Sequence, residues 1–390
     1  MTQTMDLLMT EHPYGADVQR LQDSSRWRSL QAWEGAGGVF LHDGKTYLNF
    51  SSNDYLNLSG NFGLQTAVTD AMRVYGCGAT ASRLMSGSQV IHTRLEGALA
   101  ALTGQECALV FPSGYQANVG VLTSLAGVGD TIFSDALNHA SIIDGARLSR
   151  ATVQVYGHND MAQLEQLLAQ APVEGRRIIV TDTVFSMDGD LAPVEALSNL
   201  ADAYNAILVV DEAHAIGIWG AGGGLCRHVG VLPSITLGTL GKALGSGGGF
   251  VACDPTYRDL LINRARSFIY STGVSPMNSA AALAAVELVG LRKTLGETLL
   301  QRARTFREML AAEGVNATPG DTQIIPIVVG SDTRAMALAE VLQGAGLIAT
   351  GIRPPTVPEG TSRLRLSVTL AHDEKVLTRA AAILGRVLKA

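Results

Sequence analysis

The 390-residue chain lacks the marks of a membrane-spanning, secreted or metal-binding protein. No stretch approaches the ~18 consecutive apolar residues of a transmembrane helix. Asp6, Glu11 and Asp17 interrupt the N-terminus, where a signal peptide needs an apolar core. Four scattered cysteines form no C-x-x-C pair and so fit neither a zinc site nor a disulfide framework. These absences predict a cytoplasmic protein with no metal site.

Positive charge is also scarce: 29 Lys and Arg residues stand against 35 Asp and Glu residues, a formal net charge of -6. Because nucleic acids demand a basic face, they are not expected as partners. The 47% of hydrophobic and 16% of charged residues fit a well-buried globular protein. The length predicts two or three domains.

Short apolar runs alternate with helix-like segments through the middle of the chain, which predicts an α/β domain with a mainly parallel sheet. The predicted strands are Cys107–Phe111, Thr131–Phe133, Thr152–Tyr156, Ile178–Thr181, Ile207–Val210, Ile235–Leu237 and Gly249–Ala252. Many of the 43 glycines gather near positions 216–249, which indicates active-site loops.

After Ser279 the pattern changes, which predicts a smaller α+β domain. Its expected elements are a long helical stretch that runs to about Leu310, a strand Ile324–Val329, a helix Met336–Gln343, a strand Leu364–Val368 and a helix Asp373–Leu388. The chain is thus divided into an N-terminal arm (1–55) that contains a strand Tyr47–Phe50, a large domain (56–285) and a small domain (286–390).

The first candidate motif is Ser113-Gly114-Tyr115, which follows a predicted strand and opens a helix. Backbone N–H groups at a helix start, helped by the helix dipole, form an anion site. Many turns between a strand and a helix carry Ser-Gly and bind nothing, so this motif alone decides little.

The second motif is the run V-V-D-E-A-H, in which Asp211 ends a predicted strand and His214 follows. Ligands of α/β sheets bind at the carboxyl ends of strands. An aspartate there suits magnesium, a ribose or the ring nitrogen of a pyridine cofactor, and the D-E-A-H letters resemble those of helicases. No G-x-x-x-x-G-K-[ST] loop precedes the run, so an ATP site lacks its phosphate-binding loop. Taken singly, His214 also fits a buried structural histidine.

The third motif places Lys242 among small residues, in T-L-G-K-A-L-G-S-G-G, directly after an apolar strand. Glycines allow close approach of backbone and cofactor. Desolvation lowers a lysine pKa and yields a neutral amine that can form a Schiff base. An ordinary solvated lysine in a glycine-rich loop fits the same letters.

The combination of the three motifs favours pyridoxal 5'-phosphate. That cofactor requires an anion site, an acidic partner for its ring nitrogen and an amine for its aldehyde. The three motifs supply these groups on one predicted sheet. A nucleotide-binding protein of the Rossmann or P-loop type and a non-catalytic module of the same fold remain the alternatives.

Several longer runs resemble the α-oxoamine synthases, which have the aspartate-aminotransferase-like fold (fold type I) of pyridoxal-phosphate transferases. The resemblance covers nearly the whole chain. Its runs are F-S-S-N-D-Y-L (50–56), S-R-L-M-S-G (82–87), S-D-A-L-N-H-A-S-I (134–142), V-F-S-M-D-G-D (184–190), Y-S-T (270–272) and I-R-P-P-T-V-P-E-G-T-S-R-L-R-L (352–366).

The resemblance implies roles for residues around the cofactor ring. Lys242 would form the Schiff base and remove the α-proton of the amino acid. Asp211 would pair with the ring nitrogen, and His214 would bind the phenolic oxygen. His139 would stack on the ring, although the letters alone also fit a histidine that caps a helix. Ser186 would lie beside the phenolic edge.

The resemblance also implies a phosphate site and a homodimer. Gly114 and Tyr115 would bind the phosphate through their backbone N–H groups, together with Thr239. Thr272 would reach the phosphate of the neighbouring subunit's cofactor, so that the active site lies at the subunit interface.

On the substrate side, Arg365 would bind the amino acid's carboxylate, since a bidentate arginine suits that planar group. Asn53, His139 and Thr356 would line the same side. An N-terminal arginine contacts the acyl substrate in this family. Arg26 is the preferred match, and Arg28 and Arg20 stay open.

The run 352–366 is most similar to the branch of the family that acts in biotin biosynthesis. This implies a decarboxylative condensation of L-alanine with a pimeloyl thioester carried by coenzyme A or acyl-carrier protein. Other members, such as 2-amino-3-ketobutyrate ligase, 5-aminolevulinate synthase or a serine-using enzyme, are the nearest alternatives. Ala215 and Ile216 depart from the Gly-Thr of many relatives, which leaves the local loop shape open.

Overall fold

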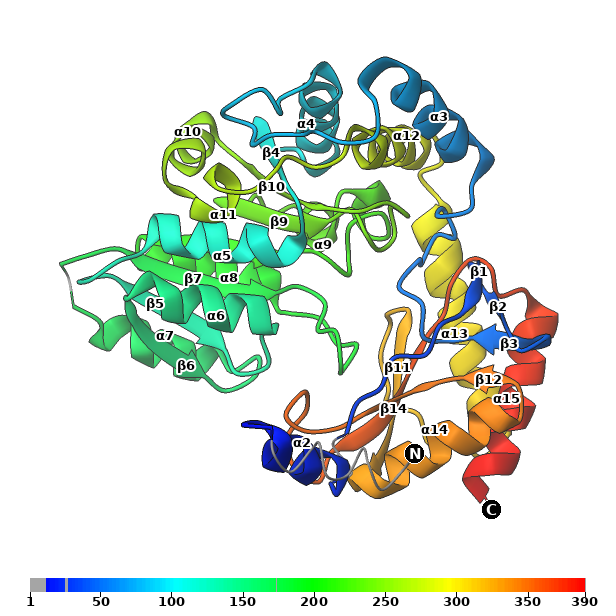
Figure 1. Cartoon of the computed structure of the whole chain (residues 1–390). Coiled ribbons are helices and arrows are strands. Elements are labelled where there is room, and N and C mark those ends of the chain that lie inside the picture. Colours follow the sequence, from blue (N-terminus) through cyan, green and yellow to red (C-terminus); the bar gives the residue numbers. More distant parts are fainter. Residues whose placement is uncertain (1–11, 25–26, 173, 390) are drawn as a thin grey trace.

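A computed structural model of the chain describes residues 12–24, 27–172 and 174–389. It has a large lobe around one sheet and a smaller lobe that contains both the C-terminal elements and the N-terminal strands (Figure 1). No helix within the described ranges is long and apolar enough to span a membrane.

The large lobe is built on a seven-stranded sheet of order β4-β10-β9-β8-β7-β5-β6. All strands run parallel except β10, which is antiparallel to both of its neighbours. The strands are β4 (Cys107–Phe111), β5 (Thr131–Asp135), β6 (Thr152–Tyr156), β7 (Arg177–Asp182), β8 (Ala206–Asp211), β9 (Ile235–Thr239) and β10 (Gly249–Cys253). Every strand predicted for this region is present, with ends that differ by at most two residues.

Helices cover both faces of this sheet because alternate strand residues point to opposite sides. Ile178 and Val180 of β7 join one apolar cluster, whereas Ile179 joins the other. The first cluster includes side chains of α5 (Gly114–Leu125), α6 (Ala140–Ser149), α10 (Pro255–Arg264) and α11 (Arg266–Ile269). The second includes side chains of α3 (Phe62–Tyr75), α4 (Val90–Thr103), α7 (Met161–Gln170), α8 (Val194–Ala203), α9 (Leu225–Val229) and α12 (Pro276–Leu291).

The small lobe joins an antiparallel sheet of order β11-β14-β13 to long helices. The helical stretch predicted to run to about Leu310 consists of two helices, because the chain leaves the first at Arg292 and starts the second at Leu295. Its elements are α13 (Leu295–Ala312), β11 (Ile324–Gly330), α14 (Asp332–Gly344), β12 (Leu347–Ile348), β13 (Thr350–Ile352), β14 (Ser362–Ser367) and α15 (Glu374–Lys389).

The N-terminal region pairs with the small lobe rather than standing alone. Strand β3 runs parallel to β12, with Leu48 opposite Leu347. The elements of the N-terminal region are α2 (Gly15–Gln22), β1 (Glu34–Ala36), β2 (Val39–His42) and β3 (Lys45–Asn49). The strand predicted at Tyr47–Phe50 is therefore present as β3. The division at residues 55 and 285 stays a prediction.

A short 3-10 turn, η1 (Gly220–Gly222), follows the segment where the sequence departs from its relatives. Ala215 and Ile216 are both buried in the core, and Ile216 forms an isolated bridge with Gly223. The loop after His214 is thus fixed by apolar packing.

Candidate active site

Lys242 lies just past the end of β9, at the carboxyl edge of the large sheet. Its Nζ is 2.8 Å from Nε2 of His214. Burial lowers the pKa of Lys242 to about 8, although the nearby carboxylates of Asp211 and Asp182 oppose this shift. An amine of this kind is neutral far more often than a surface lysine, and a neutral amine is the nucleophile.

His214 connects Lys242 to Tyr55, which comes from the segment between the two lobes. Nδ1 of His214 is 2.7 Å from the Tyr55 hydroxyl, and that hydroxyl is 3.0 Å from Oδ1 of Asn53. Burial holds the pKa of His214 well below its usual range, and Lys242 adds to this effect. Burial also raises the pKa of Tyr55. Both rings are therefore neutral near pH 7, and they can exchange hydrogen bonds along this chain.

Arg365 of β14 closes the other end of this chain. Its Nη2 is 3.3 Å from both the Tyr55 hydroxyl and Oδ1 of Asn53. Nη1 donates to Oγ of Ser367 at 2.9 Å, and Nε donates to the carbonyl of Ser186. Arg365 is only 6% exposed, yet all these partners are neutral and no acidic side chain of the described chain pairs with it. A buried guanidinium without a carboxylate is costly, which indicates an anionic ligand.

Two aspartates end neighbouring strands beside Lys242. Asp211 ends β8, and its carboxylate accepts from Nδ2 of Asn118 at 2.7 Å and from the N–H of Ala213 at 2.8 Å. Asp182 ends β7 directly opposite Asp211. Burial raises the pKa of Asp182 well above its usual range, and the charge of Asp211 adds to the rise. Burial and the neighbouring Asp211 thus both disfavour the charged form of Asp182.

The first turn of α5 offers backbone donors at the same edge of the sheet. Ser113 caps the helix by accepting from the N–H of Gln116 at 3.2 Å. The N–H groups of Gly114 and Tyr115 have no partner among the described residues. A Cβ on Gly114 would lie 3.6 Å from Cβ of Thr239, so Thr239 borders this turn. The arrangement is that of an anion site at a helix start.

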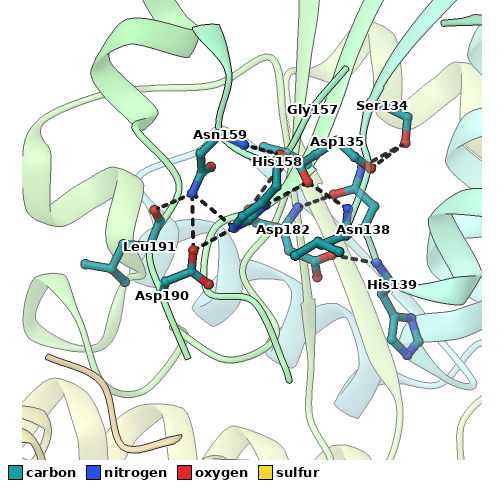
Figure 2. A network of polar contacts seen from close by, with 12 residues as sticks. Ser134, Asp135, Asn138, His139, Gly157, His158, Asn159, Asp182, Asp190 and Leu191 are labelled. Atoms are coloured by element: carbon teal, nitrogen blue, oxygen red, sulfur yellow. Dashed lines mark hydrogen bonds and ion pairs between the residues drawn. The ribbon is translucent and has the colours of Figure 1, made fainter. Parts of the chain in front are cut away.

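His139 and Ser186 lie on two loops that flank the ends of these strands. His139 is the N-cap of α6, as its letters alone allowed, and Nδ1 of its ring accepts from the N–H of Ser141 at 3.3 Å. Oγ of Ser141 also lies 2.7 Å from Nδ1, so Ser141 engages this nitrogen and Nε2 is the one left for the site. Figure 2 shows the ring pointing away from the polar network that holds its backbone. Desolvation lowers the pKa of His139.

Three predicted substrate or partner residues are not part of this cluster. Thr356 lines a cavity of about 870 Å³ in the small lobe, together with Trp27, Arg28 and Arg353. Thr272 is exposed and bridges to Ser82. Arg26 lies outside the described residues.

Three residues of the site have no role predicted from the sequence: Tyr55, Asn118 and Asp182. Asp182 carried a signal, because I-I-V-T-D has the same form as the strand that ends in Asp211. Tyr55 lies in the run F-S-S-N-D-Y-L (50–56), which resembles the family. Asn118 has no such signal, because the sequence around it does not show that α5 presents its side chain to β8.

These groups fit pyridoxal phosphate. The free N–H groups of the α5 first turn suit the phosphate, the fixed carboxylate of Asp211 suits a protonated ring nitrogen, and the amine of Lys242 suits the aldehyde. All three lie at the ends of β4, β8 and β9, on one edge of one sheet.

Comparisons with known proteins agree with this site. Residues 45–384 match the family described as aminotransferase class I and II. The chain is 46% identical over 382 residues to an 8-amino-7-oxononanoate synthase of Citrifermentans bemidjiense, covering 96% of this chain and 98% of the relative. It is also 46% identical over 379 residues to one of Geobacter sulfurreducens, covering 96% and 97%.

Solved structures confirm the predicted type I fold. A serine palmitoyltransferase variant from S. paucimobilis with a bound PLP–myriocin aldimine has a TM-score of 0.90 at 27% identity, and the match covers 96% of each chain. An 8-amino-7-oxononanoate synthase from Francisella tularensis has a TM-score of 0.74 at 28% identity and covers 88% of this chain and 98% of that one. The chain therefore belongs to the aminotransferase class I and II family and, within it, to the 8-amino-7-oxononanoate synthases.

Proposed function

We propose that this enzyme condenses L-alanine with a pimeloyl thioester and releases 8-amino-7-oxononanoate, carbon dioxide and the free carrier, as a step of biotin biosynthesis. The relatives at 46% identity support this substrate pair. The observation that carries the proposal is that Arg365 is buried and that no described acidic side chain pairs with it. A chain of contacts through Tyr55 and His214 joins this arginine to the Lys242 amine.

The cofactor is pyridoxal 5'-phosphate. Gly114, Tyr115 and Thr239 would hold its phosphate, Asp211 its ring nitrogen and His214 its phenolic oxygen, while Ser186 and His139 would border the ring. When bound, it supplies an aldehyde for amines and an electron-poor ring that draws electrons from the α-carbon.

Lys242 would supply the amine that holds the cofactor's aldehyde and, when that amine is free, the base for the α-proton of L-alanine. Its lowered pKa suits both tasks, because a base works best when its pKa is near the working pH. Nε2 of His214 lies 2.8 Å from Nζ of Lys242 and orients this amine. Asp211, whose carboxyl group is fixed by Asn118 and Ala213, would pair with the cofactor's ring nitrogen and favour its protonated form.

Arg365 binds the α-carboxylate of L-alanine, and its hydrogen bonds to Ser186 and Ser367 fix the plane of the guanidinium. In the structure Nη2 of Arg365 lies 3.3 Å from two neutral oxygens, Oδ1 of Asn53 and the hydroxyl of Tyr55. A carboxylate is a stronger acceptor and would replace these long contacts.

His139 stabilises the thioester oxygen as it takes up negative charge. Ser141 engages Nδ1, so Nε2 is the ring nitrogen available to donate into the site. Oriented donors of this type are worth ~3–4 kcal/mol in other enzymes.

The cavity of about 870 Å³ suits the acyl chain. Trp27, Trp33 and Tyr47 give it apolar walls, and Arg28 and Arg353 give it positive charge for the terminal carboxylate of a pimeloyl group. Thr350, also on its wall, lies opposite Arg365 in the β13–β14 pair. Thr356 lines the same space, and Arg26 stays the preferred N-terminal contact alongside Arg28.

The working form is proposed to be a cytoplasmic homodimer in which Thr272 reaches the partner's phosphate site. Support comes from the exposure of Thr272 in the single chain, which leaves its side chain available to a second subunit. The thioester carrier is coenzyme A or acyl-carrier protein.

The test compares amino acids and thioesters on the purified, cofactor-loaded enzyme. L-Alanine with pimeloyl thioester should give product with kcat/KM at least ten times that for glycine or L-serine. Pimeloyl-coenzyme A and pimeloyl-acyl-carrier protein should be assayed side by side. Preference for glycine with acetyl-coenzyme A or succinyl-coenzyme A would instead assign another α-oxoamine synthase activity.

A further inference from the structure

A second polar cluster lies at the same sheet edge and takes no part in the proposed chemistry. His158, two residues after β6, stands between two carboxylates (Figure 2). Its Nδ1 is 3.0 Å from Oδ1 of Asp135, and its Nε2 is 2.7 Å from Oδ2 of Asp190. The Asp135 side chain is only 1% exposed. Both ring nitrogens are therefore used, and neither is left for a ligand.

The first carboxylate belongs to the loop that carries His139. Oδ1 of Asp135 accepts from the N–H of Leu137 at 2.8 Å, and the next residue, Asn138, donates to the carbonyl of Val180 at 2.8 Å. The N–H of His139 then donates to Oδ2 of Asp182 at 2.7 Å. These bonds fix where α6 begins, and hence where the His139 ring points.

The second carboxylate belongs to the loop that carries Ser186. This loop is closed by a bridge between Val184 and Leu191. The ring of His158 packs edge-on against Phe185, with centroids 4.4 Å apart. Asn159, next to His158, donates to the carbonyl of Leu191 at 3.2 Å.

The same loop reaches the small lobe at its tip. The carbonyl of Ser186 accepts from Nε of Arg365, and Asp188 pairs with Arg363. The carbonyl of Gly189 accepts from Oγ1 of Thr322 at 2.6 Å. A shift of this loop would therefore move the guanidinium of Arg365.

We propose that His158 is a positioning residue. It joins the 135–139 loop to the 184–191 loop and so orients both His139 and Arg365 toward the substrate site. The inference rests on the proposed function for the roles of those two residues. An ion pair suits this task better than apolar contact, because charged hydrogen bonds fix direction as well as distance.

The charge state of His158 agrees with this role. Burial alone would lower its pKa, but the hydrogen bonds to Asp135 and Asp190 raise it to about 10. The ring is thus an imidazolium at neutral pH and binds both carboxylates at once.

The test uses His158→Gln and Asp190→Asn in the full-length enzyme. The glutamine variant should raise KM for the amino acid and lower kcat, each about tenfold, since small misplacements of catalytic groups are costly. Asp190→Asn, which weakens only the link toward Ser186, should raise KM with kcat within about threefold of wild type. His228→Gln, an exposed histidine that contacts Trp219, is the matched control.

Hydrogen exchange of the cofactor-free protein gives a readout that does not depend on turnover. Amides of both loops, 135–139 and 184–191, should lose protection in His158→Gln. Faster exchange confined to 157–159, or an unchanged KM in a folded variant, would overturn the inference. If wild type itself prefers another amino acid, the proposed function fails while the loop exchange still tests His158.

Discussion

The cofactor half and the substrate half of this site are built in different ways. The cofactor half comes from one sheet, whose strands end in Asp211 and Thr239 and are followed by Lys242. The substrate half is assembled from distant segments, with Asn53 and Tyr55 meeting Arg365 across more than 300 residues of chain. The first half is fixed by the fold of one lobe. The second requires the two lobes to be correctly placed, so it can fail while cofactor binding persists.

The largest expected effect is in the cofactor half. Lys242→Ala removes both the amine that bonds the cofactor and the base for the α-proton, so turnover should fall about 1,000-fold or more. Lys375→Ala on the exposed surface of α15 is the control and should keep wild-type turnover. Turnover in the Lys242 variant within about tenfold of wild type would contradict the role given to this lysine.

A smaller and more selective effect is expected in the substrate half. Arg365→Lys loses the planar fork, so KM for L-alanine should rise about 10- to 100-fold while cofactor absorbance is retained, since hydrogen bonds to charged groups contribute ~1.5–3 kcal/mol. Arg307→Lys is the control, because that arginine also donates to backbone carbonyls of the small lobe but lies outside the site. If Arg365→Lys lost cofactor binding as well as affinity for L-alanine, the two halves of the site would not be independent.

The link between the halves is the hydroxyl of Tyr55. Tyr55→Phe should lower kcat/KM about tenfold, as expected for one hydrogen-bonding group of ~1 kcal/mol or somewhat more. Tyr257→Phe, a half-buried tyrosine on α10, should leave kcat/KM unchanged. An unaffected Tyr55→Phe enzyme would mean that the two halves work independently of this contact.

The pKa of Lys242 predicts how fast the cofactor-free protein captures pyridoxal phosphate. With a pKa lowered to about 8, the neutral fraction of this amine is about a tenth at pH 7 and grows as pH rises. The rate of absorbance change should therefore increase severalfold from pH 7 to 8 and level off above about pH 9. A rate that keeps rising toward pH 10.5 would indicate an ordinary solvated lysine.

The same comparison explains what the sequence predicts well. Lys242, Asp211 and Gly114 each follow an apolar strand, and parallel strands of one sheet end at one edge, so local patterns place them together. The strands themselves are buried and lie in short apolar runs, which makes them visible in the letters.

What the sequence misses depends on packing between distant segments. Asn118 contacts Asp211 only because α5 presents that face to β8. The break between α12 and α13 lies in a stretch rich in helix-forming residues, where propensity alone does not locate the end. The pairing of β3 with β12 likewise joins residues about 300 positions apart.

Borohydride reduction of the cofactor-loaded enzyme, followed by peptide mapping, identifies the lysine that bonds the cofactor. The reduced cofactor should be found on the peptide that contains Lys242 and on no other lysine. A fully loaded sample that yields the label elsewhere, or yields none, would contradict the whole assignment.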